Sequence, residues 1–231
     1  MKIKQHLPSI FTLINLFLGF LAIINTMAGD YVIACYIILA AGAFDSVDGK
    51  IARLIGISTN FGKEIDSLAD MVSFCLAPSI LVYSLYTQNM PGISGELIAS
   101  APLIMGAIRL ARFNTDITSE NPAYFTGLPT PMNALSIASL VLFIEYFKID
   151  NPEYSQPRLL LPLILSLSYL MVSRVHYAKF PIINFNSGKQ NSLRLLGVAL
   201  FAVTFIGAIF IGYPYRVLAG FVSFYLLIGI W

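Results

Sequence analysis

Eight long runs of apolar residues, separated by short polar segments, dominate the chain. A helix needs roughly 20 apolar residues to cross a bilayer, and shorter helices are tolerated where several pack together. No internal repeat or long linker divides the runs, so residues 1–231 are expected to form a single integral-membrane domain. The pattern predicts an all-α polytopic membrane helix bundle with about eight transmembrane helices, over Pro8–Ala28, Tyr31–Leu54, Gly62–Tyr86, Glu96–Arg112, Pro131–Phe147, Leu159–Ser173, Leu193–Ile211 and Pro214–Trp231.

The composition excludes several classes of protein. Hydrophobic residues make up 57% of the chain and charged residues 11%, against about 25% charged in a soluble domain. A mean hydropathy of +0.77 excludes a disordered chain, which is poor in apolar residues. The net charge of +2 is too small to indicate a nucleic-acid partner. Cys35 and Cys75 both lie in apolar runs and are expected to be packing residues.

The distribution of basic residues predicts the orientation. Cytoplasmic segments of membrane proteins retain Lys and Arg. When the ends of the eight runs are assigned alternately to two sides, one side holds every Lys and Arg except Lys148, Arg158 and Arg216. Both termini are therefore expected in the cytoplasm, and the protein in the cell membrane.

Four carboxylates lie inside the second and third apolar runs. Asp45 and Asp48 are three residues apart, and Asp66 and Asp70 are four apart, so each pair shares one face of a helix. The segment between the runs is short, so we expect adjacent antiparallel helices. Four such carboxylates stay ionised only with cations between them, and hard oxygen ligands select Mg²⁺, Mn²⁺ or Ca²⁺.

Small residues accompany the aspartates. Gly49, Ala52 and Gly62 interleave with them, which would let a large substrate approach closely. Small residues at a helix crossing are the alternative interpretation. Arg53 follows one turn after Asp48 and Gly49 and suits an anion such as a phosphate, although it could also extend to the membrane surface.

The full pattern is Asp45-x2-Asp48-Gly49-x2-Ala52-Arg53-x8-Gly62-x3-Asp66-x3-Asp70. It resembles the complete signature of the CDP-alcohol phosphotransferases, membrane enzymes that transfer a substituted phosphate from a cytidine diphosphate ester to an alcohol and release CMP. The resemblance implies that fold, a homodimer and two divalent cations, Mg²⁺ or Mn²⁺, among the four aspartates. It also implies that Asp70 is the general base and that Asp45, Asp48 and Asp66 are primarily metal ligands. Contacts to the cytidine nucleotide are implied for Gly49, Ala52, Arg53 and Gly62.

Three further stretches resemble the membrane-integral phosphatidylserine synthases within that family: Leu7–Ile23, Ile108–Asn114 and Tyr124–Pro131. The segment Arg174–Pro181 resembles them more loosely. This resemblance implies CDP-diacylglycerol and L-serine as substrates, with phosphatidylserine and CMP as products. The lipid substrate would stay in the membrane, with the active site at its cytoplasmic surface. The alternative is the same chemistry with another acceptor, such as glycerol 3-phosphate or inositol phosphate. Tyr124–Pro131 is expected to be a stiff turn bordering the site or a simple loop.

Serine needs a cation for its carboxylate. Arg109 and Arg112 near the end of the fourth run could grip it, because an Arg fork binds a carboxylate at two points. They could instead be interfacial anchors or bind lipid phosphate. Asn114 could add a hydrogen bond. Asn15, inside the first run, falls near the nucleotide by the resemblance, and a helix–helix hydrogen bond is an equally good account.

A divalent-cation transporter is the alternative from a different class, because intramembrane acidic clusters also mark ion paths. Transporters bring ligands from inverted repeats and broken helices in both halves of the chain. Here all four aspartates lie in one pair of helices, and the second half has no counterpart. The enzyme is therefore the preferred interpretation.

Overall fold

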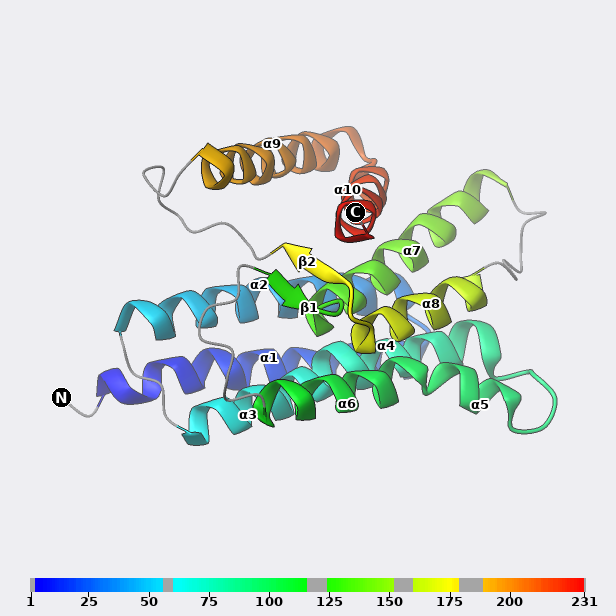
Figure 1. The fold of residues 1–231 in the computed structure, drawn as a ribbon. Coiled ribbons are helices and arrows are strands. Elements are labelled where there is room, and N and C mark those ends of the chain that lie inside the picture. Colours follow the sequence, from blue (N-terminus) through cyan, green and yellow to red (C-terminus); the bar gives the residue numbers. More distant parts are fainter. Residues whose placement is uncertain (1–2, 56–59, 116–123, 152–159, 179–188, 231) are drawn as a thin grey trace.

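The computed structural model describes residues 3–55, 60–115, 124–151, 160–178 and 189–230, and some of these, among them residues 3–9 and 48–55, by their backbone alone. Helices dominate the described chain (Figure 1). They are α1 (Ile3–Ala28), α2 (Tyr31–Ile55), α3 (Asn60–Asp70), α4 (Ala77–Val82), α5 (Ser94–Ala99), α6 (Ala101–Thr115), α7 (Thr130–Asp150), α8 (Leu160–Val172), α9 (Lys189–Ile211) and α10 (Pro214–Ile230), with the π-helices η1 (Met71–Leu76) and η2 (Tyr83–Thr87).

The helices confirm the predicted all-α membrane bundle. In the described residues, four segments are long and apolar enough to cross a membrane: Ile10–Ala28, Phe61–Thr87, Ser94–Thr115 and Thr130–Ile149. The other four predicted runs contain shorter apolar helices, over Tyr31–Val47, Leu160–Val172, Leu195–Phe210 and Pro214–Leu227.

Two of the predicted helices are not continuous α-helices. The third run changes to π-helix directly after Asp70, where the Ala77 N–H bonds the Val72 carbonyl five residues back. The fourth run is divided at Ser100 into α5 and α6. Hydropathy alone does not detect a π-helix, because its apolar content is that of the α-helix around it. Such segments are frequent at functional sites.

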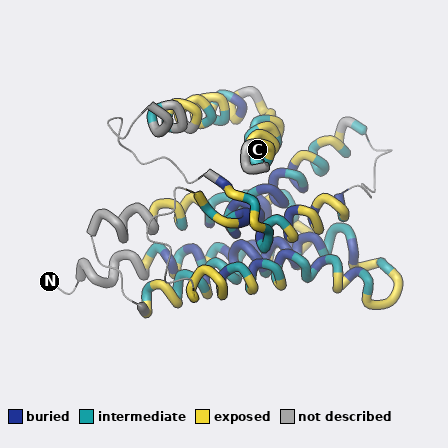
Figure 2. The backbone as a smooth tube through the Cα atoms, in the orientation of Figure 1, coloured by how far each residue is buried: buried dark blue, intermediate teal, exposed yellow. Residues whose placement is uncertain are grey.

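The core lies where α1, α2, α4 and α7 meet. Ile38, Phe74, Leu81 and Ile137 are almost completely buried there. The burial map shows the same concentration, whereas α9 is largely exposed (Figure 2). On α1, Phe17 and Phe20 point outward with more than half of their surface exposed, as expected for side chains that face lipid rather than water.

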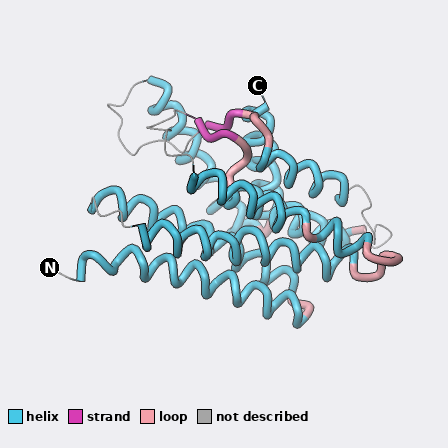
Figure 3. The backbone as a smooth tube through the Cα atoms, turned by 60° about the horizontal axis from the view of Figure 1, so that its bottom comes forward, coloured by secondary structure: helices cyan, strands magenta, loops and turns pink. Residues whose placement is uncertain are grey.

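Two short strands form outside the helices. β1 (Tyr124–Thr126) pairs antiparallel with β2 (His176–Ala178), with Phe125 opposite Tyr177. They lie side by side next to α10 (Figures 1 and 3). The sequence predicted only a turn or loop for Tyr124–Pro131, because three-residue strands carry too little pattern to be recognised.

The turn after β1 fixes the start of α7. Gly127 has φ +77°, and a Cβ there would collide with the Met171 carbonyl. Its N–H bonds the Val175 carbonyl at 2.8 Å, and the Leu128 N–H bonds the Leu170 carbonyl at 2.9 Å. Only glycine adopts this conformation at low cost. The turn thus attaches the beginning of α7 to the end of α8.

Candidate active site

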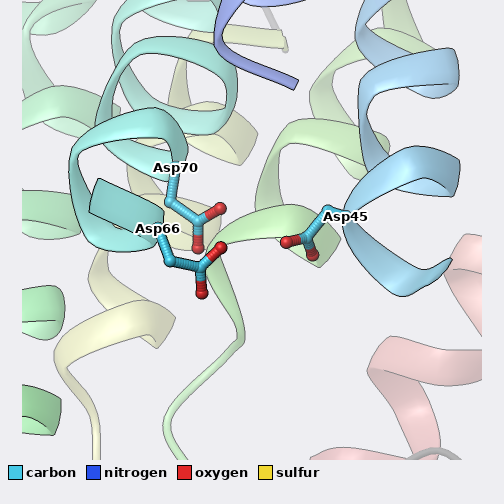
Figure 4. Close-up of side chains that lie close together, drawn as sticks. All are labelled: Asp45, Asp66 and Asp70. Atoms are coloured by element: carbon cyan, nitrogen blue, oxygen red, sulfur yellow. The ribbon is translucent and has the colours of Figure 1, made fainter. Parts of the chain in front are cut away.

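Three of the predicted carboxylates converge. Asp45 projects from α2 toward Asp66 and Asp70 on α3 (Figure 4). One carboxylate oxygen from each lies within 4.8 Å of the other two. Asp66 and Asp70 are one turn apart and therefore point the same way. Both α2 and α3 pack on α1, so the first helix aligns the two acidic faces.

The carboxylate group fits a divalent cation. Oxygens that share one octahedral Mg²⁺ at about 2.1 Å lie at most about 4.2 Å apart, and Ca²⁺ allows slightly more. The three carboxylate oxygens lie within 4.8 Å of one another, which is close to that range. All three donors are hard oxygens, which suits Mg²⁺, Mn²⁺ or Ca²⁺ and disfavours soft metals. Asp45, Asp66 and Asp70 could therefore hold such an ion.

The fourth carboxylate and most of the small residues cannot be placed. Asp48, Gly49, Ala52 and Arg53 are described by their backbone alone, which continues α2. Gly62 lies on α3, one turn before Asp66, and is half-buried. The assigned roles of these residues remain predictions.

Asn15 lies next to Asp70. Ser73 donates a hydrogen bond of 2.8 Å to the Asn15 backbone carbonyl, and Gly19, one turn later on α1, lies directly against Ser73. These contacts bring α1 close to the helix that carries Asp70. The Asn15 amide interacts with the Asp70 carboxylate. Neither amide atom makes a hydrogen bond of good geometry to any described group, although Asn15 is 1% exposed.

Arg109 points into the protein from α6. Its guanidinium lies close enough to Asp70 and Tyr225 for their charges to interact. Its Nε is buried and makes no hydrogen bond within the described part of the chain. One face of a helix carries Arg109 and Gly106, and Gly106 packs directly on Cys75. Cys35 and Cys75 are free and buried, as predicted.

Arg112 and Asn114 lie at the exposed end of α6. Arg112 donates a hydrogen bond of 3.1 Å to the Val172 carbonyl at the end of α8. The Asn114 amide bonds Ser67, the neighbour of Asp66, at 3.1 Å. Among the three residues expected to bind serine, Arg109 is the one whose charge interacts with Asp70 in the described residues. Arg112, one turn further along α6, is held instead by the end of α8.

Three buried polar residues were not singled out from the sequence. Thr130 and Asn133 lie in the first turn of α7, and Tyr177 lies in β2. They are at most 1% exposed, and their side-chain polar groups make no hydrogen bond among the described residues. Burial raises the pKa of the Tyr177 phenol, so its hydroxyl stays protonated. The i, i+3 spacing of Thr130 and Asn133 indicates a shared helix face, but it does not indicate that this face is buried.

Comparison with known proteins gives a consistent result. The family model described as CDP-alcohol phosphatidyltransferase matches residues 5–179. A CDP-diacylglycerol–serine O-phosphatidyltransferase of Helicobacter pylori (strain ATCC 700392 / 26695) is 33% identical over 223 residues, covering 96% of this chain and 89% of the relative. The Bacillus subtilis protein of the same name is 34% identical over 81% of this chain and 99% of its own length. An archaetidylserine synthase of Methanothermobacter thermautotrophicus is 33% identical over 75% of this chain and 70% of its own length.

Proposed function

The chain belongs to the CDP-alcohol phosphatidyltransferase family, and from that premise we propose that it transfers a phosphatidyl group from CDP-diacylglycerol to the hydroxyl of L-serine. The products are phosphatidylserine and CMP. Relatives named for the serine reaction match nearly the whole chain. The alternative acceptors, glycerol 3-phosphate and inositol phosphate, require a second phosphate or sugar-phosphate site.

The observation that carries the proposal is the convergence of Asp45, Asp66 and Asp70 from two helices. Clustered carboxylates at membrane depth are costly, so they usually mark a functional site. A pyrophosphate ester needs its negative charge neutralised before an alcohol can attack it. Two divalent cations, Mg²⁺ or Mn²⁺, held by Asp45, Asp48, Asp66 and Asp70, would neutralise the diphosphate and the departing CMP.

Asp70 is assigned the role of general base. It lies at the end of α3, one turn after Asp66, and one of its oxygens is buried and makes no hydrogen bond to described groups. The serine hydroxyl oxygen forms a bond to the phosphorus that carries diacylglycerol, while the bond from that phosphorus to the CMP oxygen breaks. The hydroxyl proton passes to the Asp70 carboxylate. Asn15 lies beside that carboxylate and helps to orient it.

The nucleotide and serine are assigned to opposite sides of the aspartates. Gly49, Ala52, Arg53 and Gly62 are proposed to contact the cytidine nucleotide, because small side chains leave room for it and Arg53 suits a phosphate. Arg109 is proposed to bind the serine carboxylate, since it is the cation that approaches Asp70. Arg112 and Asn114 would then join the end of α6 to α8 and α3, through their hydrogen bonds to Val172 and Ser67.

The membrane setting follows from the substrate. Four apolar helices suit an integral membrane protein, and CDP-diacylglycerol can then enter sideways from the lipid. We also propose one domain over residues 1–231, a homodimer, the cell membrane as location, and termini and active site on the cytoplasmic side. The skewed distribution of Lys and Arg supports this orientation.

The test is CMP release by the detergent-purified protein. CDP-diacylglycerol and Mg²⁺ or Mn²⁺ are supplied with serine, glycerol 3-phosphate or inositol phosphate in separate reactions. Release with serine alone, stopped by EDTA and restored by metal, is the expected result. Release with a different alcohol would replace the acceptor and keep the chemistry. If folded protein releases no CMP with any of these alcohols, the proposed function is refuted.

A further inference from the structure

A set of buried polar side chains lies on elements that pack near the helices of Asp70 and Arg109 and is not used by the chemistry described so far. Thr130, Asn133 and Tyr177 are almost completely inaccessible. The Thr130 hydroxyl, both Asn133 amide atoms and the Tyr177 hydroxyl make no hydrogen bond to the described protein groups. Buried polar groups are nearly always hydrogen-bonded, so several together indicate a partner beyond the described residues. A small polar ligand or water would provide it.

Packing around Gly106 connects these residues to the active site. A Cβ at Gly106 would meet the Cys75 side chain on one side and Cγ2 of Thr130, at 3.8 Å, on the other. Cys75 lies close enough to Asp70 and Arg109 for electrostatic interaction. The first turn of α7 is therefore adjacent to the helices that carry Asp70 and Arg109. Asn133 follows Thr130 by three residues and shares its face of α7.

Two tyrosines complete the same region. The rings of Tyr177 and Tyr225 stack with their centroids 5.7 Å apart and an angle of 20° between their planes. Tyr225, on α10, lies close enough to Arg109 for electrostatic interaction. The stacked pair is thus within electrostatic range of Arg109, and Arg109 is within electrostatic range of Asp70. Four separate parts of the chain, α6, α7, β2 and α10, contribute polar groups here.

We propose that Thr130, Asn133 and Tyr177, together with Arg109, form the pocket that binds the zwitterionic end of the acceptor amino acid. This inference rests on the proposed function. An α-ammonium needs oxygen acceptors, which the Asn133 carbonyl and the Thr130 and Tyr177 hydroxyls supply. The α-carboxylate needs a cation, which Arg109 supplies. The hydroxyl of the acceptor then lies toward Asp70. Tyr225 is a positioning residue that supports Tyr177 and Arg109.

The chemistry predicts selectivity for a hydroxy amino acid. A site that hydrogen-bonds a polar group strongly rejects analogues that lack the group, because its own buried groups are then left unpaired. Ethanolamine lacks the carboxylate, and glycerol lacks both charges. Both should be much poorer acceptors than serine in the same assay.

The decisive variants are Asn133→Leu and Tyr177→Phe, each of which removes polar atoms and keeps a similar shape. Loss of one hydrogen bond to a charged group weakens the affinity for the ligand by at least about tenfold. We therefore expect the KM for serine to rise about tenfold or more in each variant, with the KM for CDP-diacylglycerol within about twofold of the original. The melting temperature of Asn133→Leu should not fall, because a buried unpaired amide is replaced by an apolar group.

Matched controls come from the same elements and neighbours. Asn151→Leu changes an asparagine at the other end of α7, where Asn151 bonds the Phe147 carbonyl. Tyr169→Phe changes a tyrosine of α8 that is 67% exposed. Both controls should keep the KM for serine within about twofold of the original.

The outcomes separate the inference from the proposed function. If the unaltered protein releases no CMP with serine, the proposed function fails, and the pocket assignment fails with it. If the unaltered protein is active and folded Tyr177→Phe keeps its KM for serine, the pocket assignment alone is overturned. An equal rise in the KM for both substrates also overturns it, since that result indicates a structural role. Should Asn133→Leu not fold, Tyr177→Phe decides.

Discussion

The close contact between α1 and η1 brings α1 next to the helix that carries Asp70, and Gly19→Ala tests this contact directly. A Cβ at Gly19 would overlap the Ser73 hydroxyl and lie 2.7 Å from the Ser73 Cα. Carbon atoms in contact are normally about 3.5–4.0 Å apart, so α1 has to move by about 1 Å. Because the near atom is backbone, a rotamer change cannot relieve the overlap.

The magnitude follows from three contributions. Overpacking costs about 1–3 kcal/mol. Loss of the buried hydrogen bond from Ser73 to the Asn15 carbonyl adds a further contribution of about 0.5–1.5 kcal/mol, the usual net value for such a bond. The better helix propensity of Ala returns about 0.5–1 kcal/mol. The net destabilisation is about 2 kcal/mol, which for a chain of this size lowers the melting temperature by roughly 4–8 °C.

The assay is thermal unfolding in detergent combined with CMP release. The control is Gly207→Ala on α9, where an added Cβ would meet nothing within 4 Å. That control should keep or slightly raise the melting temperature. Gly19→Ala should also lose activity below its melting transition, because Asn15 moves away from Asp70. The reasoning is refuted if the two variants have the same melting temperature and the same activity.

The remaining predictions concern the chemistry and the turn before α7. Asp70→Asn should lower kcat by roughly 10²–10⁴-fold, the usual contribution of a general base, while CDP-diacylglycerol still raises the melting temperature; retained turnover removes Asp70 from that role. Arg109→Gln should raise the KM for serine more than Arg112→Gln does, because only Arg109 approaches Asp70; steady-state kinetics that show the reverse order contradict this assignment. Gly127→Ala should lower the melting temperature more than Gly207→Ala, because its φ of +77° and the Met171 carbonyl leave no room for a methyl group; equal melting temperatures would be inconsistent with that strain.

The class of fold and the two helices that carry the acidic cluster could be predicted from the amino-acid sequence. Apolar runs of membrane length predicted the helices, because the lack of water in a bilayer forces the backbone to satisfy its own hydrogen bonds. The spacing of Asp66 and Asp70 predicted a shared face, because helical geometry is local and regular. The convergence with Asp45 then followed from a short connection between two helices, and the structure confirms it for these three residues.

The groups outside that pair that surround the candidate site could not be predicted, because they depend on how the helices pack. Arg109 and Arg112 are equivalent in sequence, yet one points toward Asp70 and the other bonds the end of α8. Thr130, Asn133 and Tyr177 carry no local mark of burial. Their surroundings come from elements far apart in the chain, brought together by the Gly127 turn, the β1–β2 pair and the last helix. Contacts of that kind depend on how the helices pack, and hydrophobic periodicity within one helix contains no information about the polar groups of another.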